Sequence, residues 1–267
     1  MTLVDPQFLA VGSGAAQRRI AYLLGEGALA DAPGLVWLPG FRSEMTSTKA
    51  SDLAAFAGEL GVAMTRFDYS GHGQSGGDFL EGTIGRWLEE TRAVFQALTR
   101  GPQIVVGSSM GGYLALLLLR ALLREAPGDA GRIKAMVLIA PAWDMTDRLM
   151  PDRLSDADRR ELMERGVYMR PSRYGDGPYP ITRRLIEEGQ NHLIGSAAFD
   201  PGRPIHILHG LEDPDVPWEH TLDLVSHLTG DWTKVSAVPD GEHRLSRPQD
   251  LALLRSIIGE YLPLLRA

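Results

Sequence analysis

The 267-residue chain contains no cysteine. It therefore has no disulfide, no thiolate ligand for a metal and no cysteine nucleophile, and the redox state of its compartment stays open. Long apolar runs are also missing, since the longest, residues 113–119, is far shorter than a membrane span. The chain does not begin with a basic segment followed by an apolar run. We therefore expect a cytoplasmic protein without a membrane span.

Positive charge is scarcer than negative charge, which gives a net charge of −7. This balance argues against nucleic acid or an anionic membrane surface as the main partner. Hydrophobic residues make up 44% of the chain and charged residues 23%, as is usual for a soluble globular protein. The length suits one large domain, so we expect residues 1–267 to form a single unit.

Strand and helix patterns alternate along most of the chain. After two short strands at residues 8–11 and 19–24, strands are expected at residues 35–38, 62–67, 103–106, 134–140, 205–209 and 234–238, with helices at 49–60, 84–98, 110–124, 218–228 and 248–264. This alternation predicts an α/β fold with a mostly parallel eight-stranded sheet and helices on both faces.

Residues 142–201 interrupt the alternation. The segment is rich in Arg, Asp and Pro, has one clear amphipathic helix at residues 156–165 and lacks a convincing strand. We interpret residues 142–201 as a small lid inserted after a sheet strand.

The most informative motif is Gly107-Ser108-Ser109-Met110-Gly111. It lies between a predicted buried strand and a predicted helix, which is the context that a G-x-S-x-G nucleophile elbow requires. Two glycines keep such a tight turn free of clashes. A negative intermediate on Ser109 would lie at the amino end of the helix, where N–H groups favour charge. Ser109 is therefore our candidate nucleophile.

A serine nucleophile needs a base that takes its proton and an acid that fixes the base's tautomer. Among seven histidines, His243 lies in the loop between the last predicted strand and the last predicted helix, and it follows the chain order Ser, Asp or Glu, His. The strand at residues 205–209 leads into three carboxylates. We expect Asp213 to be the third member of a triad, with Asp215 as the alternative and Glu212 as the weakest candidate.

An oxyanion hole needs two backbone N–H donors. The residue after the nucleophile, Met110, should supply one, and Phe41 in the turn Pro39-Gly40-Phe41 after a predicted strand should supply the other. The alternative is that this turn only ends the strand.

Two other patterns are interpreted as structural. The loop at residues 67–75 is rich in glycine, but its spacing fits neither a dinucleotide loop nor a P-loop. His206 and His209 have weak metal-ligand geometry, so core or hydrogen-bonding roles are favoured. We expect neither a metal nor a cofactor.

Together these residues resemble the α/β-hydrolase superfamily. The resemblance sharpens to the abhydrolase-domain branch of mitochondrial palmitoyl-protein thioesterases, also described as acyl-glucuronide esterases. The segments that carry it are Leu38-Pro39-Gly40-Phe41, Thr48-Lys49-Ala50, residues 66–71, 101–112, 166–168, Pro171-Ser172-Arg173-Tyr174, residues 208–210, Asp213, residues 216–218 and His243-Arg244. The resemblance covers nearly the whole chain and implies the same triad, Ser109, Asp213 and His243. The family's mitochondrial leader is absent here, so we expect a bacterial or cytosolic relative.

The expected activity is hydrolysis of carboxylic esters or thioesters, with a small molecule or an acylated protein as the substrate. Arg42 is a candidate contact for an anionic substrate such as a glucuronide, the alternative being solvation or a pair with Glu44. Met150 and Met163, together with Leu149, Leu154 and Leu162, are expected either to contact an acyl group or to pack the lid onto the core. Two other functions stay open: a carbon–carbon hydrolase acting on β-diketone-like substrates, and a receptor without catalysis. Dehalogenase and epoxide hydrolase activities are disfavoured, because those enzymes use an aspartate nucleophile where this chain has Ser109. The sequence does not set the oligomeric state.

Overall fold

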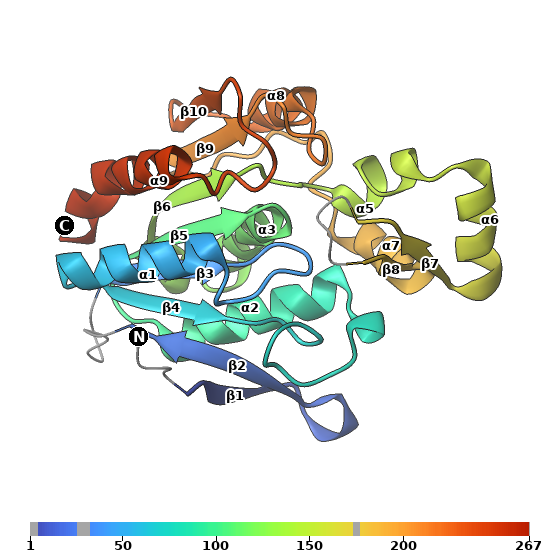
Figure 1. Ribbon diagram of the computed structural model, residues 1–267. Helices are drawn as coiled ribbons and strands as arrows, with labels where there is room; N and C mark the ends of the chain where they lie inside the picture. Colours follow the sequence, from blue (N-terminus) through green and yellow to red (C-terminus); the bar gives the residue numbers. More distant parts are fainter. Residues whose placement is uncertain (1–4, 26–32, 173–176, 267) are drawn as a thin grey trace.

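The computed structural model describes residues 5–25, 33–172 and 177–266. Eight strands in these residues form one sheet in the order β1–β2–β4–β3–β5–β6–β9–β10 (Figure 1). Their bounds are β1 Gln7–Val11, β2 Arg18–Leu24, β3 Gly34–Leu38, β4 Ala63–Phe67, β5 Gln103–Ser108, β6 Ile133–Ile139, β9 Ile205–Gly210 and β10 Thr233–Val238. β2 runs antiparallel to β1 and β4, and every other pair in the sheet is parallel. The prediction of a mostly parallel eight-stranded sheet is confirmed.

Helices cover both faces of this sheet because its strands alternate their side chains between two cores. In β3, Val36 and Leu38 join one core, whereas Leu35 and Trp37 join the other. The first core also takes side chains from α2, α3 and α8, and the second takes them from α1 and α9. The bounds of these helices are α1 Thr48–Leu60, α2 Ile84–Leu98, α3 Met110–Glu125, α8 Trp218–His227 and α9 Pro248–Tyr261.

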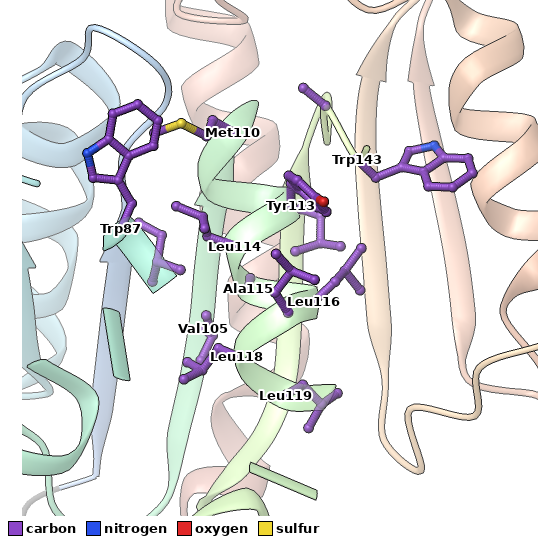
Figure 2. Close-up of a cluster of buried hydrophobic side chains, with 14 of the residues drawn as sticks. Trp87, Val105, Met110, Tyr113, Leu114, Ala115, Leu116, Leu118, Leu119 and Trp143 are labelled. Carbon is purple, nitrogen blue, oxygen red and sulfur yellow. The ribbon is translucent and has the colours of Figure 1, made fainter. Parts of the chain in front are cut away.

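Helix α3 lies at the centre of the first core. Its side chains are apolar on nearly every side, so it is buried from Met110 to Leu119 and again at Leu122. Figure 2 shows Trp87 of α2 and Trp143 in the same cluster as the α3 side chains. Each fully buried leucine here contributes roughly 1.5–3 kcal/mol relative to exposure. This burial fixes the amino end of α3, and with it Ser109, relative to the sheet.

Residues 142–201, here called the inserted segment, connect β6 to β9, and the helices and strands within them lie beyond the carboxyl ends of the strands of the large sheet (Figure 1). The segment contains α5 Met145–Arg148, α6 Asp156–Arg165, β7 Val167–Arg170, β8 Tyr179–Thr182 and α7 Arg183–Gly189. Residues 173–176, which include Arg173 and Tyr174 of the family resemblance, lie outside the described residues.

The prediction that this segment lacks a strand was wrong, because β7 and β8 pair as an antiparallel two-stranded sheet. Each is four residues long, and β8 contains Pro180, so neither shows the alternation by which strands are recognised. Helix α6 has the predicted bounds but only a weak apolar face, since Leu162 is its one buried residue.

Further differences concern helices. The short helices α4, Pro127–Arg132, α5 and α7 were not predicted. Helix α9 ends at Tyr261 and a 3-10 turn covers Leu262–Leu265, because Pro263 has no N–H to continue the helix that was predicted to reach residue 264. In the described part of the chain, every helix is too short or too polar to cross a membrane.

Candidate active site

Ser109 occupies the sharp turn between β5 and α3. Its backbone has φ 56° and ψ −118°, which is a strained conformation for a residue with a side chain. A Cβ atom on Gly107 would lie 2.4 Å from the carbonyl oxygen of Gly111, and one on Gly111 would lie 2.0 Å from that of Leu38. Both positions therefore require glycine. The Ser109 N–H donates to Ile139 of β6 at 2.8 Å, which ties the turn to the sheet.

Three side chains from distant parts of the chain form a continuous hydrogen-bonded row. His243 Nε2 lies 3.1 Å from Ser109 Oγ, and His243 Nδ1 lies 2.7 Å from Asp213 Oδ2. The other oxygen of the Asp213 carboxylate accepts from the N–H groups of Asp215 and Val216 at 2.7 and 2.9 Å. With three such bonds the buried carboxylate is fixed in place and can orient the imidazole.

Asp215, the alternative acid, is engaged elsewhere. Its carboxylate lies 3.3 Å from Arg153 Nη1, and its carbonyl oxygen accepts from Arg153 Nη2 at 2.6 Å. Arg153 belongs to the inserted segment, so Asp215 joins this segment to the loop after β9. The geometry favours Asp213 as the partner of His243.

The loop after β3 lies directly against the nucleophile. A Cβ atom on Gly40 would lie 3.2 Å from the Ser108 carbonyl oxygen and 3.3 Å from Ser109 Cβ. The neighbouring Phe41 side chain is packed among aromatic rings, including Phe79 at 5.1 Å and Trp87 at 5.9 Å between centroids. Within the described residues, the N–H groups of Phe41 and Met110 donate to no other group. Two donors are therefore free for an oxyanion, as an acyl-transfer site requires.

Ser109 and His243 open onto a cavity of about 770 Å³. The inserted segment contributes much of its wall, including Met145, Met150 and Tyr168. Among the described residues that line it, basic side chains outnumber acidic ones: Arg42, Lys49, Arg153, Arg170 and Arg244 face a single carboxylate, Asp215. A cavity lined mainly by arginine and lysine side chains favours substrates that carry negative charge.

Arg42 lies at this cavity with its guanidinium 5.0 Å from the centre of the Tyr179 ring. The described residues show no ion pair between Arg42 and Glu44, whose carboxylate accepts from Thr46 at 3.4 Å. The guanidinium of Arg170, from β7, lies 5.9 Å from the same ring. Tyr179 and Arg170 were not predicted, because they lie in a Pro-rich stretch without a recognisable motif.

Of the five apolar residues that were expected either to contact an acyl group or to pack the segment onto the core, only one lines the cavity. Met150 lines the cavity. Met163 does not, since its side chain is 56% exposed and it is absent from the lining, so it is not brought to the site. The adjacent Leu162 takes the buried position of α6, and the next residue on a helix points about 100° away. Leu149, Leu154 and Leu162 are buried away from the cavity.

The competing histidines are held elsewhere. His72 is buried, and burial lowers its pKa to about 4, so it is neutral at neutral pH. His206 contacts Ser236 at 2.8 Å, and His209 contacts the carbonyl oxygen of Val216 at 3.0 Å. His206 and His209 therefore take core hydrogen-bonding positions.

Asp68, from the glycine-rich loop, supports the loop after β3. Its carboxylate accepts from the N–H groups of Met45 at 2.6 Å and Gln74 at 2.9 Å. Burial raises the pKa of Asp68, whereas these two bonds lower it. A Cβ atom on Gly73 would lie 2.2 Å from this carboxylate, which explains the glycine there.

Asp213, Asp215 and His243 place possible metal-ligating atoms within 4.8 Å of one another. Each group already has a partner: Asp213 binds His243 and two N–H groups, and Asp215 binds Arg153. A cation would compete with these hydrogen bonds and this ion pair for the same oxygen and nitrogen atoms. The geometry therefore favours the hydrogen-bonded row over a metal site.

Comparison with known proteins decides the family. Residues 35–166 match the family profile described as "Serine aminopeptidase, S33". The human mitochondrial palmitoyl-protein thioesterase ABHD10 is 32% identical over 223 residues, which cover 83% of this chain and 70% of that protein. This chain belongs to the α/β-hydrolase family, in the branch of the ABHD10 proteins.

Solved α/β-hydrolase structures agree with this placement. Mouse ABHD10 superposes with a TM-score of 0.83 at 30% identity, covering 98% of this chain and 100% of that one. A putative hydrolase from Agrobacterium vitis S4 reaches a TM-score of 0.91 at 44% identity, covering 96% and 98% of the two chains. Est1E from Butyrivibrio proteoclasticus with bound ferulic acid, at 19% identity and a TM-score of 0.74, shares the fold. The predicted family is confirmed.

Proposed function

We propose that this α/β-hydrolase cleaves carboxylic esters or thioesters through a triad of Ser109, His243 and Asp213 and an acyl-enzyme. The observation that carries the proposal is the row of hydrogen bonds from Asp213 through His243 to Ser109, at the wall of a cavity and beside two free N–H donors. Such a row can move one proton between a serine hydroxyl and a leaving group without leaving a charge unpaired.

The reaction follows from this geometry in two steps. Ser109 Oγ attacks the carbonyl carbon while His243 Nε2 takes its proton, and the Phe41 and Met110 N–H groups bind the oxyanion. The imidazolium then protonates the leaving alcohol or thiol as its bond to carbon breaks. Water, deprotonated by the same imidazole, attacks the acyl-serine, and the proton returns to Ser109 Oγ as the acid leaves.

The substrate class is supported by the relatives and by the cavity wall. The ABHD10 proteins are named palmitoyl-protein thioesterases, which favours an acyl-thioester or ester, either a small molecule or an acylated protein. We assign Met150 to the acyl group, since its flexible apolar side chain adapts to different chains. We assign Arg42 to an anionic group of the substrate, because its guanidinium lies at the cavity without a carboxylate partner in the described residues.

The test is a paired hydrolysis series on the purified protein. It compares p-nitrophenyl esters of increasing chain length with the matching acyl-thioesters, and Ser109→Ala serves as the control. Turnover that depends on Ser109 supports the proposal, and the preferred chain length measures the acyl pocket. A folded protein that turns over neither series contradicts it, and cleavage of β-diketones instead would indicate a carbon–carbon hydrolase.

A further inference from the structure

Lys49 connects the core to the loop that carries His243. It lies in the first turn of α1 and lines the same cavity as Ser109 and His243. Its ammonium group donates to the carbonyl oxygen of Arg244 and lies 3.5 Å from Ser246 Oγ. These partners follow Lys49 by 195 and 197 residues, so the contact joins two distant parts of the chain.

We propose that Lys49 is a positioning residue, which holds the loop between β10 and α9 so that His243 stays within reach of Ser109. The inference rests on the proposed function, because it assigns His243 the role of base. Arg244 directly follows His243, so a bond to its carbonyl oxygen restrains the backbone next to the imidazole.

The loop between β10 and α9 contains a strained backbone conformation, which the contact with Lys49 can stabilise. Leu245 has a φ of 43°, a left-handed value that costs free energy for a residue with a branched side chain. Leu245 lies between Arg244 and Ser246, the two residues that Lys49 contacts. Strained backbone persists where its surroundings fix it on several sides. Burial of the Leu245 side chain fixes one side, and Lys49 fixes the other.

The charge of Lys49 is held at a cost to stability. Burial lowers its pKa to about 8, because removal from water disfavours the ammonium form. The groups that face it are Glu242, Asp250 and Asp213, which favour the charge, and Arg244, which opposes it. No carboxylate forms an ion pair with Lys49 in the described residues. A buried charge that lowers stability is typical of functional sites, so its presence beside His243 supports a functional role for Lys49.

Stability and activity should therefore respond to pH in opposite directions. The folded state binds fewer protons at Lys49 than the unfolded state between pH 8 and 10.5, so this group makes the protein more stable as the pH rises there. Positioning by the ammonium weakens over the same rise, because a neutral amine is a weaker donor than a charged one. A fall in kcat above about pH 8 without a fall in stability distinguishes positioning from a structural role.

The experiment compares Lys49→Met, Lys49→Arg and the control Lys234→Met, since Lys234 is one of three lysines in the chain and pairs with Glu260 on the surface. Turnover of a neutral p-nitrophenyl ester is measured from about pH 6.5 to 9.5. Hydrogen exchange of residues 241–247, which requires no turnover, reports directly on the loop. Melting temperature at neutral pH reports on stability.

For Lys49→Met we expect kcat to fall about 10- to 100-fold, as for other small displacements of a catalytic group, while KM changes less than about threefold. Its loop should exchange about tenfold faster, and its melting temperature should not fall. Lys49→Arg should keep most of the activity and lose the decline above pH 8, because arginine stays charged. Lys234→Met should match the parent protein in every measurement.

Unchanged exchange of the loop in Lys49→Met would overturn the inference, whether or not the protein turns over an ester. Faster exchange with unchanged kcat in an active protein would also overturn it. If the parent protein shows no Ser109-dependent turnover but its loop loosens in Lys49→Met, the proposed function fails while the structural link between Lys49 and the loop stands.

Discussion

Gly111 of α3 approaches Leu38 of β3 so closely that a Cβ atom on Gly111 would lie 2.0 Å from the Leu38 carbonyl oxygen. Leu38 is the last residue of β3, and Gly40 and Phe41 follow it. The contact therefore presses the amino end of α3, which carries Ser109 and Met110, against the turn that offers the Phe41 N–H. Because Gly111 has no side chain, the N–H groups of Phe41 and Met110, the two candidate oxyanion donors, can lie close together.

Gly111→Ala tests this contact. The added methyl group would force the backbone of α3 or β3 to move, so we expect a loss of about 3 kcal/mol or more in the free energy of unfolding, measured by urea denaturation. Gly128→Ala in α4 is the matched control, because its Cβ atom would meet nothing within 4 Å. That variant should be unchanged or about 0.5–1 kcal/mol more stable. Equal stability of the two variants would contradict the account.

Asp213→Asn and Asp215→Asn separate the two candidate acids. Asparagine at 213 would hold the wrong tautomer of His243, so kcat for ester hydrolysis should fall on the order of 10⁴-fold, as the same change does in a serine protease triad. Asparagine at 215 removes the charge that pairs with Arg153 but leaves the bond between Asp213 and His243 in place, so kcat should fall less than about tenfold. A larger loss in Asp215→Asn would reverse the assignment.

Arg42→Gln tests the proposed anion contact. Two esters of equal size, one neutral and one with a carboxylate, are compared by their KM values. An exposed ion pair contributes up to about 1 kcal/mol, so KM for the acidic ester should rise up to about fivefold while KM for the neutral ester stays constant. Equal changes for both esters would remove Arg42 from substrate recognition.

The low pKa of His72 leads us to expect that the protein loses stability in acid. Its pKa is about 4 in the folded protein and about 6.5 when unfolded, so the folded state binds fewer protons between these values. Its contribution is therefore present above pH 6.5 and lost as the pH falls to 4. A shift of this size corresponds to roughly 3 kcal/mol. His220, whose pKa burial also lowers to about 4, acts in the same direction.

His72→Phe suits the aromatic surroundings of Phe79 and Trp87 and removes this titration. Between pH 6.5 and 4, its free energy of unfolding should fall by roughly 3 kcal/mol less than that of the parent protein. The measurement is urea denaturation at each pH. Parallel curves for the two proteins would show that His72 does not titrate in this range.

The sheet and its covering helices could be predicted because each element carries its own pattern. Leu35 to Leu38 is apolar throughout and buried, and the leucines of α3 are apolar on all sides. The mutual placement of Ser109, Asp213 and His243 also followed from chain order and from the carboxyl ends of parallel strands. Their hydrogen bonds agree with that placement, and their catalytic roles remain predictions.

The inserted segment could not be predicted in the same way. β7 and β8 are held by each other, and no apolar alternation marks either one. The position of Met163 depended on which side of α6 faces the core, and a helix with one buried residue gives little pattern to decide it. Lys49 lies in a segment that carries the family resemblance, but its contact with the His243 loop could not be predicted, because its partners lie almost 200 residues away.

Covalent labelling with a fluorophosphonate tests the central claim most directly, because such a reagent reacts with a serine only where a base and an oxyanion hole activate it. Intact mass and peptide mapping are followed together with ester turnover. We predict one adduct per chain on the peptide that contains Ser109, loss of turnover in proportion to labelling, and no adduct in Ser109→Ala. An unlabelled protein that still hydrolyses esters, or an adduct on another residue, would contradict the account.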